Sequence, residues 1–156
     1  IVRMEMAISN TGERPLEDVK AQFCWNHRRA PLLGREIFAM SDSGWADFSR
    51  YIIDPPFRKY HFVVEDPSEE NPKELLPITR RLLFSETLHE KGVFATAIGS
   101  GDAKYIMSNW EAPCTDTGLH FGIIQPGESA SRSLFLGLGF ATRNDWLRRM
   151  SPYVTR

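Results

Sequence analysis

The sequence has almost no excess charge of either sign. Its 19 Lys and Arg residues against 20 Asp and Glu residues leave a formal net charge of −1. A protein that binds nucleic acid through the phosphates needs clustered positive charge, and the basic residues here are scattered. The best aromatic and basic stretch, Phe57 to Phe62, is short and holds only Arg58 and Lys59 as fixed cations. We therefore expect no nucleic-acid partner.

Long apolar runs and cysteines are also scarce. No apolar run approaches the roughly 18 residues of a membrane-spanning helix, so we expect no membrane partner. Cys24 and Cys114 are the only cysteines, too few for a disulfide scaffold. They are compatible with one disulfide in an oxidising compartment or with two reduced thiols in the cytosol, and we favour the thiols.

Several catalytic signatures are missing as well. The chain has no glycine-rich phosphate loop, no Gly-x-Gly-x-x-Gly and no His-Glu-x-x-His. It also lacks a Gly-x-Ser-x-Gly elbow and a Cys-x-x-Cys pair. These absences argue against nucleotide-driven chemistry and against the common metalloprotease and serine hydrolase plans, and we expect no cofactor.

What is present is strand-like alternation at both ends of the chain. Val2, Met4, Met6 and Ile8 share one face of the first segment, a period of two that predicts a half-buried strand. A turn at 10–15 and a second alternating segment at 19–26 come next. These two strands and their short loop predict an antiparallel hairpin.

The middle of the chain, 28–90, is less regular. Ser41 to Ser43 predict the cap of a short helix that carries Trp45, and 60–65 predict a short strand. Leu82 to Phe84 suit either a strand or a helix.

The alternating pattern then returns. Gly99 to Asp102 predict a hairpin turn between strands at 93–98 and 104–110. Further strands are expected at 120–124 and 131–140, joined by a turn at 126–129. Asn144 is expected to cap a closing helix that bears Trp146.

This succession of short strands and turns predicts a mostly β fold. We expect a single domain, residues 1–156, with an antiparallel β-sandwich or jelly-roll architecture and short peripheral helices.

The first candidate site cluster stands at the end of the second strand. Trp25, His27 and Arg28 fall where a strand gives way to a loop, and loops commonly carry function. His27 suits a general base and Arg28 an anion clamp, with Trp25 as a ligand-stacking ring. The alternative is that His27 is a solvated loop residue and the arginines pair with nearby acids.

The second cluster holds Trp110, Glu111, Asp116 and His120. Two carboxylates can divide acid and base roles in glycoside chemistry, and Trp110 can stack on a sugar ring. We take Glu111, His120 and His27 as candidate catalytic residues, and Trp110 and Asp116 as candidate ligand-binding residues. The alternative is a loop in which Trp110 enters the core and Asp116 makes a turn.

A metal centre is a further alternative. Three of the four His residues (27, 61, 89 and 120) would suit copper, iron or zinc if they met in space. Their sequence spacing has no metal-ligand pattern, so we assign no metal ligands.

Two turn phrases resemble a known group of proteins. Ile8 to Leu16 resembles the strand-and-turn phrase N-T-G-x-x-P-L of extracellular and carbohydrate-active β-sandwiches, and Ile124 to Ala130 resembles their P-G-E-S turn before the last strand. With Trp110-Glu111 between them, the layout resembles uncharacterised bacterial β-sandwich proteins. It is also distantly similar to part of the galactose-mutarotase-like supersandwich. The chain is shorter than a complete supersandwich, and no catalytic role is carried over.

Three functions stay open. The first is a carbohydrate-associated domain, enzymatic or not, that binds a sugar or glycan where the loops after Trp25 and Trp110 meet. The second is an interaction or assembly domain that uses exposed sheet edges. The third is a small jelly-roll metalloenzyme.

Overall fold

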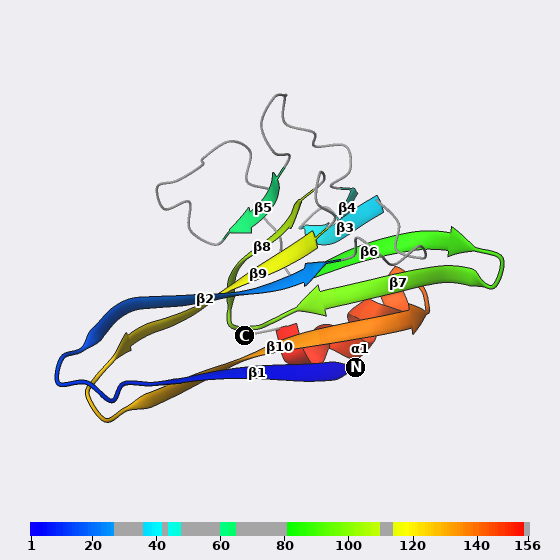
Figure 1. Ribbon diagram of the computed structural model, residues 1–156. Helices are drawn as coiled ribbons and strands as arrows, with labels where there is room; N and C mark the ends of the chain where they lie inside the picture. Colours follow the sequence, from blue (N-terminus) through cyan, green and yellow to red (C-terminus); the bar gives the residue numbers. More distant parts are fainter. Residues whose placement is uncertain (27–35, 42–43, 48–59, 65–80, 110–113, 155–156) are drawn as a thin grey trace.

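The computed structural model describes residues 1–26, 36–41, 44–47, 60–64, 81–109 and 114–154. The described residues form two antiparallel sheets and one helix, which confirms the predicted β-sandwich with a short helix (Figure 1). In chain order the elements are β1 (Val2–Ser9), β2 (Leu16–Asn26), β3 (Glu36–Ser41), β4 (Gly44–Asp47), β5 (Tyr60–Val64), β6 (Leu82–His89), β7 (Gly92–Gly99), β8 (Ala103–Asn109), β9 (Cys114–Ile124), β10 (Ser129–Phe140) and α1 (Arg143–Val154).

The six-stranded sheet has the order β1-β10-β7-β6-β3-β4, and the four-stranded sheet has the order β2-β9-β8-β5. The strands predicted from alternation are therefore present, but two predicted hairpins are wrong. β1 pairs with β10 while β2 pairs with β9, so the 10–15 turn crosses between the sheets. The 100–102 turn also crosses, because β7 pairs with β6 and β10 whereas β8 pairs with β5 and β9.

The expected helix near Trp45 is a further correction. Residues 44–47 form β4, which pairs with β3 so that Trp45 lies opposite Met40. Leu82 to Phe84 belong to a strand, β6, in which both faces are buried. One face packs against the other sheet and one against α1, which is why the segment has no alternation of polar and apolar residues.

The apolar core has two layers. Between the sheets lie ten buried residues that include Leu83, Ile98, Ile106 and Phe121. On the outer face of the six-stranded sheet, α1 buries Trp146, Met150 and Val154 against the strands, a spacing that places them on one side of a helix. Figure 1 shows α1 beneath this sheet.

The cap of α1 differs from the prediction. Thr142 is the cap: the backbone amide of Asp145 donates to Thr142 Oγ1 (3.2 Å), and the backbone amide of Thr142 donates to the Asp145 carboxylate (3.3 Å). This reciprocal pair is a capping box with Asp in the usual Glu position. Asn144 instead accepts a hydrogen bond from the indole of Trp45 (2.9 Å), which ties the helix to β4. No helix in the described part of the chain is long and apolar enough to cross a membrane.

Candidate functional site

The structure describes three of the seven residues expected at the site. Trp25 lies on β2, and Asp116 and His120 lie on β9. The other four (His27, Arg28, Trp110 and Glu111) lie outside the described residues.

The three described residues do not form one group. Trp25 packs against the core between the sheets, in line with Phe23 and the other inward residues of β2. Asp116 and His120 occupy the opposite, outer face, because Leu119 and Phe121 fill the inward positions of β9 and alternate residues of a strand face opposite ways. Trp25 therefore does not share a surface with Asp116 and His120.

The outer face of the four-stranded sheet collects the polar side chains. Strands β2 and β9 place Lys20 opposite His120, Gln22 opposite Gly118 and Cys24 opposite Asp116. We refer to this surface as the polar face, defined by Asp18, Lys20, Gln22, Cys24, Tyr105, Asp116, Gly118 and His120.

Tyr105 lies at the centre of the polar face. Its ring covers Gly118, so closely that a Cβ atom at Gly118 would overlap the ring atoms. Its hydroxyl group donates to Gln22 Oε1 (3.0 Å). The aromatic ring thus extends from β8 across β9 to β2. Only glycine at position 118 leaves room for it.

The electrostatics keep Tyr105 a neutral phenol. Burial raises the pKa of Tyr105 above its usual 10.0, and the negative charge of Asp116 acts in the same direction more strongly than Lys20 opposes it. Asp116 itself is 5% exposed. Tyr105 is therefore a ring and a hydrogen-bonding group at physiological pH, and not a phenolate base.

His120 is held by an acid on the neighbouring strand. Its Nε2 atom lies 2.9 Å from Asp18 Oδ1, and Lys20 Nζ lies 2.6 Å from Asp18 Oδ2. The hydrogen bond from Lys20, and after it the one from His120, lowers the pKa of Asp18 below its usual 3.8. Asp18 is then a hydrogen-bond acceptor at neutral pH, so Nε2 of His120 is the donor in this contact.

The backbone at Asp18 is adapted to this contact. Asp18 has a φ of 49°, which is unusual for a residue other than glycine. It lies in a β-bulge, where the register of β2 against β9 shifts between Leu16 and Lys20. Bulges commonly re-aim a side chain, and this one presents the Asp18 carboxylate to His120.

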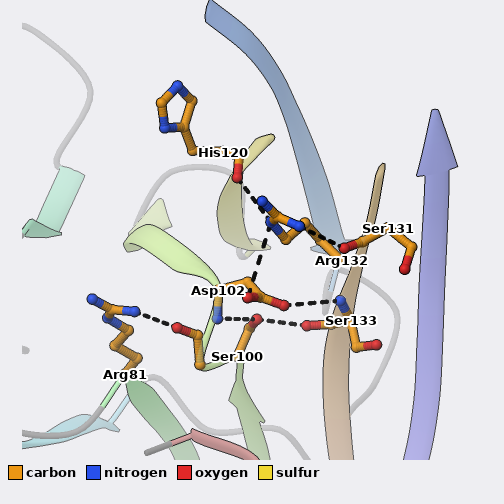
Figure 2. Close-up of polar contacts among 8 residues, drawn as sticks. Arg81, Ser100, Asp102, His120, Ser131, Arg132 and Ser133 are labelled. Carbon is orange, nitrogen blue, oxygen red and sulfur yellow. Dashed lines mark hydrogen bonds and ion pairs between the residues drawn. The ribbon is translucent and has the colours of Figure 1, made fainter. Parts of the chain in front are cut away.

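A second polar cluster supports β9 from the other sheet (Figure 2). Arg132 on β10 donates from Nε to the backbone carbonyl of His120 (3.0 Å), and its guanidinium group lies 5.4 Å from the centre of the Phe121 ring. Figure 2 shows that the imidazole of His120 points away from this cluster. Arg132 thus joins the two sheets directly behind the residue that presents the imidazole.

The other residues of this cluster bond to the backbone of β10 where no described strand pairs with it on that side. β7 stops pairing with β10 at Phe135, and beyond it the turn takes over: Ser100 Oγ donates to the carbonyl of Ser133 (2.5 Å) and Asp102 Oδ2 accepts from the Ser133 amide (3.4 Å). Asp102 also lies 3.9 Å from Arg132 Nε. These polar groups are used by the backbone and by one another, so the cluster is structural.

The two loops that were expected to meet lie outside the described residues, and the structure describes only the strand ends that lead into them. Asn26 and Asn109 are the last described residues before 27–35 and 110–113, and both pair with Cys114. The two segments therefore start from the same end of the four-stranded sheet. Their contribution to a site stays a prediction.

No three His, Cys, Asp or Glu side chains converge in a metal-binding arrangement among the described residues. His89 lies at the end of β6, where its ring is 5.6 Å from that of Phe140, and His120 lies on the other sheet. These two histidines do not meet. Cys24 is exposed on the polar face.

Sequence reasoning missed Tyr105 and Asp18 as site residues. Alternation places Asp18 on the same face as Lys20 and Gln22, so half of the polar face was readable. Tyr105 was not, because nothing local to it reveals that its ring lies over Gly118. Comparison with protein-family models, curated proteins and solved structures finds no match.

Proposed function

We propose that the protein binds a carbohydrate on the polar face, with Tyr105 as the ring on which a sugar stacks. The observation that carries the proposal is the position of Tyr105, whose ring lies against Gly118 with polar side chains around it. Sugar rings have a face of C–H groups, and the electron-rich face of an aromatic ring attracts such groups. The resemblance of the two turn phrases to carbohydrate-active sandwiches agrees with this proposal.

The groups around Tyr105 suit sugar hydroxyls. Gln22 and His120 supply donors and acceptors. The charges of the polar face are mixed, since Lys20 is balanced by Asp18 at 2.6 Å. A neutral sugar is therefore a better match than a strongly anionic one.

The two described acids of the polar face, Asp18 and Asp116, lie too far apart to act as a pair in glycoside hydrolysis. Asp18 is six residues along β2 from Cys24, the register partner of Asp116, which is roughly 20 Å at the rise of a strand. Inverting glycosidases hold their two carboxyl groups about 6.5–9.5 Å apart, and retaining ones hold them closer. Asp18 and Asp116 therefore cannot flank one glycosidic bond.

The test is a titration of the isotope-labelled protein with a panel of neutral oligosaccharides, monitored by amide NMR shifts and calorimetry. We expect the shifts to cluster on β2, β8 and β9 around Tyr105. Tyr105→Ala should weaken binding about tenfold through loss of stacking, whereas Tyr105→Phe keeps the ring and loses less.

Tyr153→Ala is the matched control, because Tyr153 is a partly exposed tyrosine on α1, stacked on Phe135 away from the polar face. If no neutral sugar shifts the polar face at millimolar concentration, or if Tyr105→Ala binds as well as the wild type, the proposal is wrong.

A further inference from the structure

The outermost strand of the six-stranded sheet, β1, has an open side. Among the described strands it is bonded only to β10, and Figure 1 shows it along the margin of the molecule. An open edge offers backbone donors and acceptors to another strand. This edge is distinct from the polar face, and its pairing does not depend on the proposed carbohydrate binding.

The other described edges are protected in ways that β1 is not. β2 is interrupted by the bulge at Asp18, and bulges discourage edge pairing. β4 and β5 have 4 and 5 residues. In contrast, β1 runs in unbroken register from Val2 to Ser9.

One hydrogen bond fixes the direction of the open backbone groups. The amide of Asn10 donates to the carbonyl of Glu128 (2.9 Å), on the β10 side. Since successive amides of a strand point to opposite sides, the amides and carbonyls of Arg3, Glu5 and Ala7 point to the open side.

The charges on β1 are self-complementary. In an antiparallel pair of two β1 strands with Met4 opposite Met4 of the second copy, each Arg3 lies opposite Glu5 of the other. These pairs are also the hydrogen-bonded ones, because Arg3 and Glu5 have their backbone groups on the open side. Both side chains are accessible, at 60% and 46% exposure, and already lie within 2.7 Å of each other in one chain.

The apolar side of β1 fits the same arrangement. Val2 is 54% exposed, while Met4 and Met6 pack against the inter-sheet core. In the same antiparallel pair, Val2 lies opposite Met6 of the second copy, on the core side of both sheets. Pairing would therefore cover apolar surface that one chain leaves in water.

We infer that β1 pairs with β1 of a second copy of this chain, around a two-fold axis at Met4, to form one continuous sheet across a homodimer. A two-fold axis requires the same patch on both subunits to be self-complementary. The alternation Arg3–Met4–Glu5 meets that requirement in a single strand.

The test is sedimentation velocity of the full chain over a concentration series. The wild type should dimerise. Arg3→Glu and Glu5→Arg should each raise the dissociation constant about tenfold, because each places like charges opposite one another twice. The double variant, Arg3→Glu with Glu5→Arg, should restore the wild-type value since the pairs are opposite in charge again.

Arg14→Glu is the control for net charge, because Arg14 is exposed in the 10–15 turn outside β1. Circular dichroism checks that each variant is folded, as expected for exposed positions. A wild type that stays monomeric, single variants that dimerise like the wild type, or a double variant that fails to recover each overturn the inference.

Discussion

At the scale of single residues, Asn10 shows how a few polar contacts join the two sheets. It is 3% exposed, and its side-chain amide donates to the carbonyls of Arg14 (2.8 Å) and Ile124 (2.9 Å) while its Oδ1 accepts from Gly12 (3.0 Å). The amide of Gly127 in turn donates to the carbonyl of Asn10 (2.8 Å). The two turn phrases, 8–16 and 124–130, therefore pack on each other.

We predict that Asn10→Ala lowers the free energy of unfolding by about 2–3 kcal/mol, because the buried carbonyl of Ile124 loses a donor. Urea denaturation measures this. Thr11→Ala, at an exposed neighbour, should change the value by less than about 0.5 kcal/mol. Equal effects of the two substitutions would contradict the role given to Asn10.

Thr142 controls the titration of Asp145. Hydrogen bonds from the side chain and then the backbone of Thr142 lower the pKa of Asp145 below its usual 3.8. A carboxyl group with a lowered folded pKa stabilises the fold above its unfolded pKa, and that contribution is lost as the pH falls through the folded pKa.

Thr142→Ala should therefore raise the pKa of Asp145 toward 3.8 and weaken the acid dependence of unfolding below about pH 4. Loss of the cap should also lower stability by about 1 kcal/mol. Carboxyl NMR titration measures the pKa, and Asp18, whose pKa is lowered by other partners, should titrate as before. An unchanged pKa of Asp145 in Thr142→Ala would contradict the role given to the Thr142 side chain.

At the scale of elements, contact between α1 and β10 depends on a missing side chain. The Trp146 ring lies so close to Gly137 that a Cβ atom there would overlap it. Trp146 is 3% exposed, so the ring has little room to move. The helix approaches the sheet this closely because Gly137 offers only backbone.

Gly137→Ala should destabilise the protein by about 1–3 kcal/mol through overpacking, which thermal unfolding measures. Leu138→Ala is the neighbouring control, since Leu138 is 44% exposed and faces away from α1. We expect a smaller loss for the control. A Gly137→Ala variant as stable as the wild type would show that the helix can shift without cost.

The sequence predicted a strand correctly where one face of the strand is exposed to solvent and the other is buried. β1 and β2 alternate because each packs on one side only. β6 does not alternate because both of its faces are buried, and β4 was mistaken for a helix because four residues are too few to show a period.

At the scale of the whole molecule, the chain changes sheet at three described turns: 10–15, 100–102 and 125–128. β1 pairs with a strand more than a hundred residues away. Such non-local pairing slows folding, because the chain loses conformational entropy when the distant strands meet, before their contacts stabilise the fold.

We predict that refolding takes milliseconds to seconds, as for other β-sandwiches, and stopped-flow tryptophan fluorescence measures it. The refolding rates of Asn10→Ala and Gly137→Ala can be compared, since the first variant alters the turn that joins the two sheets and the second alters the contact between α1 and β10. Microsecond refolding would contradict the topology.

The sequence by itself determined which residues form strands at the two ends of the chain, which side of each strand is apolar, and that the fold is a β-sandwich. These features depend on the period of neighbouring residues, which any local segment displays. Which strands pair was decided only by the tertiary structure, because a turn such as 100–102 has the same local chemistry in a hairpin and in a crossing between sheets. The same holds for the candidate site: Lys20 and Gln22 could be placed on one face from alternation, whereas Tyr105 over Gly118 and Asp18 beside His120 exist only because β2, β8 and β9 lie side by side.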